Sequence, residues 1–100
     1  MHTKILAVRP VSRNYLPRYE VSVVQSFEEA KDMIIAAEGS GSPYDDLALP
    51  VDDEPAFMEF FAWMDKTGRR YPFSVHGQRS ALQFIRIRDL ARSCGFHFTD

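Results

Sequence analysis

Residues 46–64 read DLALPVDDEPAFMEFFAWM and combine a strand pattern with a helix pattern in one short stretch. Asp46–Pro50 is a short apolar run typical of a buried strand. The acids at 52–54 suit the positive end of a helix dipole, and Pro55 suits a first helical turn. The stretch therefore predicts a buried strand that leads into an amphipathic helix, whose buried stripe comprises Phe57, Phe60, Phe61 and Met64.

Two strand patterns precede this stretch. Lys4–Val8 is apolar, rich in strand-forming residues and closed by an Arg-Pro pair, so it predicts a buried first strand. Tyr19–Val24 is rich in β-branched residues and predicts a second strand. Residues 9–18 hold two prolines and show no helical period, which predicts a loop. Because a parallel crossover needs about a dozen residues, this loop leaves the direction of the second strand open.

A helix is predicted directly after the second strand. Ser26 and Glu29 have the spacing of a capping box, in which the hydroxyl accepts an N–H of the first turn and the carboxylate reaches back to the cap. The Gly-Ser-Gly-Ser-Pro run at 39–43 ends this helix. Its apolar face is expected to comprise Phe27, Ala30, Met33, Ile34 and Ala37.

The C-terminal third of the chain repeats the alternation. Tyr71–His76 predicts a strand whose proline lies near its start, and Gln78–Ser93 predicts a helix with Gly95 at its C-cap. Phe96–Phe98 alternates and would suit one more short strand. Helices that alternate with short apolar strands predict an α/β sandwich around a mostly parallel sheet. We expect a single domain over residues 1–100, since chains divide only when they are much longer.

Composition limits the classes of protein that this chain can belong to. The apolar content of 45% is enough for a core but forms no run long enough to cross a bilayer, so a soluble protein without membrane contact is expected. One cysteine, Cys94, cannot form an internal disulfide, and the reducing cytoplasm is therefore the expected compartment. The three histidines are scattered without zinc-site spacing, so neither a metal nor a cofactor is predicted.

The net charge of −2 conceals a strong segregation along the chain. Residues 28–65 carry eleven acids and one lysine, whereas residues 66–92 carry seven basic side chains and one acid. The basic third helix could bind a partner protein, or the acidic middle of a second copy in a homodimer. Pairing within one chain would explain the same charges. Nucleic-acid binding is disfavoured, because the pI is near 5.9 and no recognition motif accompanies the arginines.

Several short motifs resemble one family. They are VVQSFEEA at 23–30, YDDLALPVD at 44–52, FAWM at 61–64 and YPFSVH at 71–76. These motifs are similar to those of divergent receiver-like domains described as cyclic-phosphate-processing receivers, which are relatives of the response-regulator receivers. The resemblance covers nearly the whole chain. It implies a receiver-like, flavodoxin-like three-layer sandwich with a four- to five-stranded sheet.

The resemblance also implies where a receiver would keep its chemistry. Receivers place an acidic pair after the first strand to hold a divalent metal, but this chain has Val8-Arg9-Pro10 there. They place an Asp-x-Asp motif after the third strand, where this chain reads Pro50-Val51-Asp52 and keeps only the second aspartate. His76 matches the family's Val-His motif, although Gly77 replaces the small hydroxyl residue that follows it. The expectation is a degenerate receiver without metal binding or phosphoacceptance.

The candidate site lies where ligands bind in open α/β sheets, beyond the carboxyl ends of the strands. Arg9, Asp52 and His76 each follow a different strand and could meet there as an anion site, or as an acid/base pair acting on a phosphoester. Asp52 and His76 are the catalytic candidates, and Asp53 and Gln78 complete the set of candidate ligand-binding residues. The structural alternative is that Asp52 or Asp53 caps a helix, His76 binds a loop carbonyl and Arg9 pairs with an acid.

Three functions follow from these patterns. A non-catalytic regulatory or protein-interaction module agrees with the loss of carboxylates at both receiver positions. A small enzyme on cyclic or linear phosphoesters would use Arg9, Asp52 and His76. A nucleic-acid binder would use the basic third helix.

Overall fold

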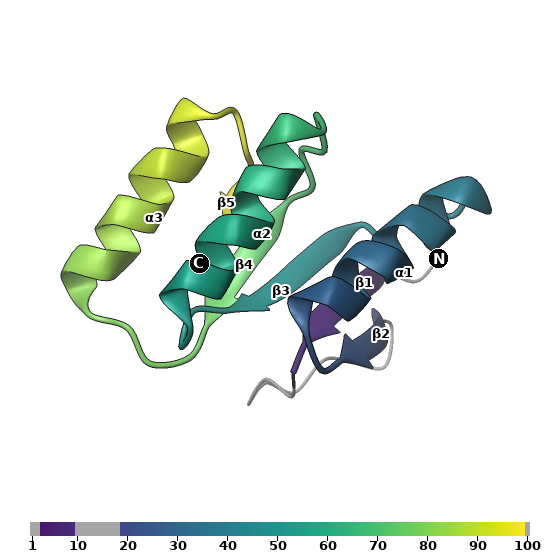
Figure 1. Cartoon of the computed structure of the whole chain (residues 1–100), viewed down its shortest axis with the longest axis horizontal. Coiled ribbons are helices and arrows are strands. Elements are labelled where there is room, and N and C mark those ends of the chain that lie inside the picture. Colours follow the sequence, from purple (N-terminus) through teal and green to yellow (C-terminus); the bar gives the residue numbers. More distant parts are fainter. Residues whose placement is uncertain (1–2, 10–18, 100) are drawn as a thin grey trace.

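The computed structural model describes residues 3–9 and 19–99 and contains five strands and three helices (Figure 1). Residues 10–18 of the loop expected at 9–18 lie outside the described residues, as does His2. No helix within the described ranges is long and apolar enough to span a membrane. The elements, in chain order, are β1 Thr3–Val8, β2 Tyr19–Val24, α1 Phe27–Gly39, β3 Asp46–Pro50, α2 Glu54–Lys66, β4 Phe73–His76, α3 Ala81–Ser93 and β5 Phe98–Thr99.

The five strands form one all-parallel sheet in the order β2-β1-β3-β4-β5. This is the flavodoxin-like strand order, so the α/β, flavodoxin-like fold class predicted from the sequence is confirmed. The direction of β2, which the sequence left open, is parallel to β1 in a register that pairs Thr3 with Tyr19 and Val8 with Val24. The strand predicted at the C-terminus exists as the two residues of β5.

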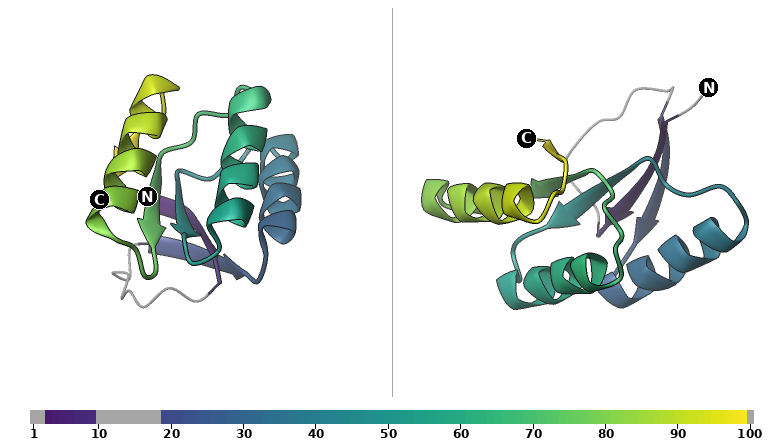
Figure 2. Two further views of the ribbon diagram at one scale, coloured as in Figure 1. Left: turned by 60° about the vertical axis from the view of Figure 1, so that its left-hand side comes forward. Right: turned by 90° about the horizontal axis from the view of Figure 1, so that it is seen from above.

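The hydrophobic core lies between the helices and one face of the sheet (Figures 1 and 2). Alternate strand residues such as Leu6 and Leu49 point to this face, where all three helices pack. Phe73, at the start of β4, is completely buried, and its ring centroid lies 5.3–6.2 Å from those of four other rings. These rings come from α2, β5 and the loop before β5, and they are Phe57, Phe61, Phe96 and Phe98.

The strand residues that alternate with these point to the other face of the sheet. The register aligns Ala7 with Ala48 and Ala48 with Ser74 across three neighbouring strands, and all three side chains are buried. Within residues 3–9 and 19–99, no helix lies on this face (Figure 2). The described residues therefore show two layers, the sheet and the three helices that cover one of its faces.

Side-chain caps fix the start of each helix. Ser26, Asp53 and Ser80 each accept the N–H of the residue three positions later, at 3.1–3.2 Å. The Ser26 part of the predicted capping box is therefore confirmed. The Ser80 cap places the start of α3 at Ala81, three residues after the predicted start at Gln78.

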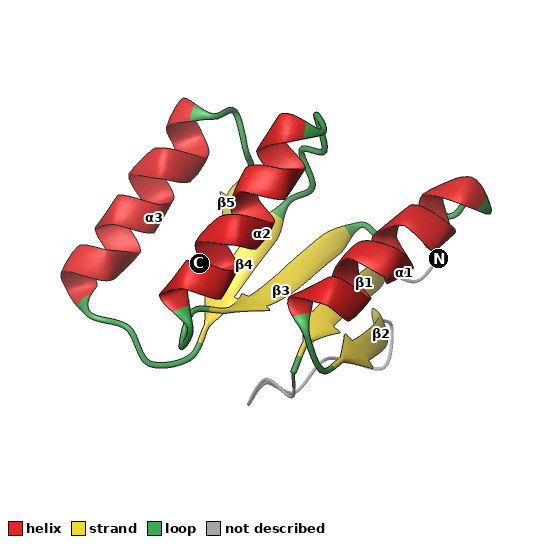
Figure 3. Cartoon of the chain, in the orientation of Figure 1, coloured by secondary structure: helices red, strands yellow, loops and turns green. Residues whose placement is uncertain are grey.

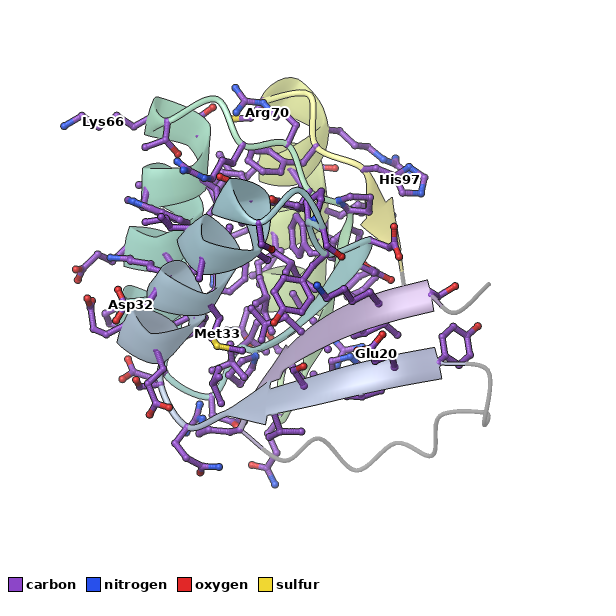
Figure 4. The ribbon with its side chains drawn as sticks, turned by 90° about the vertical axis from the view of Figure 1, so that its right-hand side faces the viewer. Glu20, Asp32, Met33, Lys66, Arg70 and His97 are labelled. Carbon is purple, nitrogen blue, oxygen red and sulfur yellow. The ribbon has the colours of Figure 1, made fainter. Side chains whose placement is uncertain are left out.

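Three other details differ from the sequence prediction. β4 begins at Phe73, so Pro72 precedes the strand and costs it no ladder hydrogen bond. Cys94 is the C-cap of α3, and Gly95 follows it with a φ of 81°, as expected one position beyond a cap. Met33, which was expected on the apolar face of α1, lies at the margin of that face and is 38% exposed (Figure 4).

A polar cluster joins α1, α2 and the approach to β4 at the amino-end edge of the sheet. Arg69 makes a bidentate ion pair with Glu38, with N–O distances of 3.0–3.2 Å, and its guanidinium lies 4.8 Å from the Trp63 ring centroid. Tyr71 donates its hydroxyl to the same carboxylate. The Tyr71 hydrogen bond and Arg69 together lower the pKa of Glu38, whereas burial and the neighbouring carboxylate raise the pKa of Tyr71.

Candidate functional site

The carboxyl ends of the parallel strands meet at one edge of the sheet, where the loops after β1, β3 and β4 begin (Figure 3). All five candidate residues lie on or directly after these three strands. Arg9 directly follows β1, and Asp52 and Asp53 lie two and three residues after the end of β3. His76 is the last residue of β4, and Gln78 lies two residues after it. The backbone joins two of the loops here, because the N–H of Val51 donates to the carbonyl of His76 at 2.8 Å.

Asp52 and Gln78 are in direct contact. The exposed carboxylate of Asp52 accepts the backbone N–H of Gln78 through Oδ1 at 2.9 Å. Gly77 makes this approach possible, because its φ is 106° and a Cβ at this position would lie 2.8 Å from Cγ of Asp52. Asp52 therefore ties the loop after β3 to the loop after β4.

Asp53 is the helix-capping acid. Its Oδ1 accepts the N–H of Ala56 at 3.2 Å, and Pro55 occupies the first turn of α2 as predicted. Of the two acids that the sequence offered for this role, Asp53 performs it.

His76 lies on the face of the sheet opposite the helices. Its Nε2 is 3.0 Å from Oγ of Ser74, which is 5% exposed. Residues two apart on a strand point to the same face, so the strand itself brings these side chains together. The hydroxyl of Ser74 is thus one partner of this imidazole, on the face of the sheet that lies away from the helices.

Arg9 has the only positive φ, 59°, among the described non-glycine residues. Its N–H donates to the carbonyl of Val24, which continues the β1–β2 ladder by one residue. Within residues 3–9 and 19–99 its guanidinium has neither an ion-pair partner nor a hydrogen-bond partner, so the acid pairing that the sequence allowed is not seen there. A left-handed backbone costs about 1 kcal/mol for a side chain of this kind.

A cavity of about 300 Å³ opens beside Arg9, between the first turns of α1 and α2. Asp53 also lines it, but Asp52 and His76 do not. Gln78 lines a second, shallower groove of about 660 Å³ between the starts of α2 and α3. The five candidates therefore lie in three different places. Arg9 and Asp53 line the cavity, Asp52 contacts Gln78 beside the groove, and His76 lies on the face of the sheet opposite the helices.

The sequence argument missed most of the cavity wall. Ser26 and Phe27 were interpreted only as a cap and a core residue, and Lys31 and Glu59 were not singled out. The strand order supplies the missing information, because it brings the starts of α1 and α2 together, more than twenty residues apart in sequence. In the described ranges, no three His, Cys, Asp or Glu side chains gather where they could hold a metal ion.

Several of the arginines in the basic segment pair with acids of the same chain. Besides the Arg69–Glu38 pair, Arg70 binds Asp65 at 2.7 Å, and Arg86 lies 3.4 Å from Glu54. Intramolecular pairing, one of the two explanations left open by the charge pattern, accounts for these three. The pairs are partly exposed, so each contributes little to stability.

The outer face of α3 carries large apolar side chains that the sequence argument did not single out. Leu82 is 67% exposed and Ile85 is 41% exposed. They lie three residues apart and therefore on the same side of the helix, away from the buried Ile87 and Ala91. The signal was present in the sequence, because positions 82 and 85 fall outside the helical stripe that includes Ile87 and Ala91.

The chain was compared with protein-family models, curated proteins and solved structures. No family model, no curated protein and no solved structure matches the chain. The flavodoxin-like fold class stands on the strand order of the sheet, whereas the receiver-like resemblance stands on the sequence motifs alone.

Proposed function

We propose that this chain is a degenerate receiver-like domain, a non-catalytic regulatory module that acts by binding protein through the exposed face of α3. The observation that carries the proposal is the exposure of Leu82 and Ile85 on a helix rich in arginine. Large apolar side chains at an exposed and rigid position are typical of interaction sites.

The roles of the edge residues support a function without catalysis. Arg9 follows β1 where a receiver needs an acidic pair, and Pro50 stands where the first aspartate of the third-strand motif is expected. The one matching carboxylate, Asp52, accepts the N–H of Gln78. Phosphoryl transfer requires a positioned acceptor and charge neutralisation by a metal, and these substitutions remove the ligands for both.

The composition of the α3 face supports protein as the partner. Leu82 and Ile85 form an apolar centre, and Arg86 and Arg92, both exposed, lie to either side. An apolar centre within a polar rim is the usual anatomy of a protein interface. The acidic chain as a whole, with its pI near 5.9, is less suited to nucleic acid.

A second copy of the chain is the partner that fits best. The outer surface of α1 is acidic and apolar, with Asp32 at its centre and Ile35 50% exposed (Figure 4). It complements the basic and apolar face of α3. The two helices lie on the same side of the sheet with α2 between them (Figure 1). A two-fold axis parallel to α2 would therefore place each α1 against the other copy's α3. Such a module would work in the cytoplasm, consistent with its single cysteine.

Charge exchange tests the partner and the surface together. Arg86→Glu and Asp32→Arg should each weaken self-association in sedimentation velocity, because each places like charges together. An equimolar mixture of the two variants should recover association, since both contacts of the mixed dimer then join opposite charges. Lys66→Glu changes an exposed charge at the far end of α2 and serves as the matched control (Figure 4). A wild-type chain that stays monomeric at all concentrations would contradict the proposal.

Loss of receiver chemistry is tested separately by NMR. Magnesium together with an acyl-phosphate mimic should leave the amide signals of Asp52 and His76 unchanged. Saturable shifts at these two residues would show that the edge still binds a metal and a phosphoryl group, and the enzyme interpretation would replace the present one.

A further inference from the structure

The cavity beside Arg9 lies at the point where the strand order reverses. After β1 the chain continues to β2 at one edge of the sheet, whereas after β3 it continues to β4 toward the other edge. The strand order therefore reverses between β1 and β3. The crevice outside the carboxyl ends of strands at such a point is the general ligand position of open α/β sheets. Its volume of about 300 Å³ is at the lower end for small-molecule sites.

The floor of this cavity is apolar. Val8, at the end of β1, and Phe60, on α2, are both buried, and the ring of Phe27 lies 5.0 Å from that of Phe60. Ala56 adds a small side chain from the first turn of α2. A ligand here would rest a hydrocarbon group on these side chains.

Charges of both signs line this cavity. Arg9 comes from the end of β1, Glu28 and Lys31 come from α1, and Asp53 and Glu59 come from α2. Lys31 already has a partner in Glu28 at 3.3 Å. Arg9 has no such partner within the described residues, and one of the Asp53 oxygens caps α2. The charges that remain for a ligand are therefore a guanidinium on the sheet side and carboxylates on the α2 side.

This arrangement discriminates between classes of ligand. A simple anion would meet the carboxylates of Asp53 and Glu59, and a simple cation would meet Arg9. An entirely apolar molecule would desolvate these charges without replacing their hydrogen bonds, which is costly. A small zwitterion satisfies both sides, because a carboxylate can form a bidentate pair with a guanidinium while an ammonium lies beside carboxylates.

We propose that this cavity binds a small zwitterion with an apolar side chain, the chemistry of a free aliphatic or aromatic α-amino acid. The ligand carboxylate pairs with Arg9, its ammonium lies toward Glu59 and Asp53, and its side chain rests on Phe27 and Ala56. The residues of this site differ from those of the α3 interaction face, so the inference goes beyond the proposed function and does not depend on it.

The test is a titration of the full-length chain with matched ligands, followed by ¹⁵N NMR. L-leucine and L-phenylalanine are the zwitterions, N-acetyl-L-leucine keeps only the negative charge, and L-leucinamide keeps only the positive one. The two zwitterions should shift the amides of residues 8–9, 26–31 and 53–60 with a Kd at or below about 1 mM, which corresponds to about −4 kcal/mol. The two blocked compounds should bind at least about tenfold more weakly.

Two variants connect the binding to its charges. Arg9→Gln should weaken leucine binding, and Glu59→Gln should do so without removing a helix cap. Lys66→Gln, at the C-terminal end of α2 and outside the cavity, is the control and should bind leucine as the wild type does. Unfolding curves of each variant verify that the fold is retained.

Every other outcome overturns the proposal. Equal binding of N-acetyl-L-leucine would indicate an anion site, and equal binding of L-leucinamide would indicate a cation site. An absence of shifts with both zwitterions would mean that the cavity charges serve only the fold. Undiminished binding by the Arg9 and Glu59 variants would place the ligand elsewhere.

Discussion

Asp52 and Gln78 are 26 residues apart in sequence, yet the carboxylate of the first accepts the backbone N–H of the second at 2.9 Å. This hydrogen bond crosses from the loop after β3 to the loop after β4. Asp52 is one of the two residues that the sequence analysis named as catalytic candidates. A group with catalytic potential thus serves to hold two loops together.

Gly77 should be the least replaceable glycine at this edge. Gly77→Ala requires a φ of 106° and brings Cβ against the Asp52 carboxylate, so we expect a loss of about 3 kcal/mol in the free energy of unfolding. Gly68→Ala is the matched control, because Gly68 also has a positive φ but has open space around it. That variant should lose only about 1 kcal/mol. Urea unfolding measures both values.

A double variant separates the two causes. Asp52→Ala removes the group that a Cβ at position 77 would meet. The loss due to Gly77→Ala should therefore be smaller in the Asp52→Ala background than in the wild type. Strict additivity of the two substitutions would show that the carboxylate does not restrict this turn.

Asp53 should behave as a helix cap. Asp53→Ala is expected to lower the free energy of unfolding by about 1 kcal/mol, because the N–H of Ala56 loses its acceptor. Asp53→Asn keeps an acceptor oxygen and should stay within about 0.5 kcal/mol of the wild type, the remaining difference being its charge near the helix dipole. Equal losses in the two variants would contradict the capping role.

Glu38 should make the fold sensitive to acid. Its pKa in the folded chain lies below the ordinary value, because Tyr71 and Arg69 both bind the charged form. A lowered folded pKa contributes stability above the unfolded pKa of about 4.3, and this contribution is lost as the pH falls through the folded value. Glu38→Gln should therefore be less stable than the wild type at neutral pH, and the difference should shrink in acid.

The measurement is urea unfolding at several pH values, followed by the fluorescence of Trp63. Tyr71→Phe removes one of the two groups that bind Glu38 and should show a smaller version of the same effect, about 1 kcal/mol at neutral pH. A constant difference between Glu38→Gln and the wild type at all pH values would count against the assignment.

The fold could be predicted from the sequence because its signals are local. Asp46–Pro50 and the stripe on α2 each show their period within a few residues, and Ser26 lies directly at the start of its helix. The spacing could not show that Met33 is 38% exposed, because a position at the margin of an apolar helix face has the same spacing as a buried one. The start of α3 was placed too early because the Ser80 cap was not recognised in the sequence.

The candidate site could be predicted only in part, since its geometry depends on contacts distant in sequence. The strand ends correctly indicated the edge on which Arg9 and Asp52 lie. Neither the left-handed backbone of Arg9 nor the contact between Asp52 and Gln78 has a local pattern. The division of the candidates among three places follows from the faces of the sheet, which strand order and register decide.

The central claim is that the exposed face of α3 binds a second copy of the chain, and concentration-dependent ¹⁵N NMR tests it most directly. As the protein concentration rises, we expect saturable shifts at Leu82, Ile85 and Arg86 on α3 and at Asp32 and Ile35 on α1. Amides of the opposite face of the sheet, such as Ala48, should not change. Spectra that are identical at all concentrations, or shifts that avoid α3, would contradict the claim.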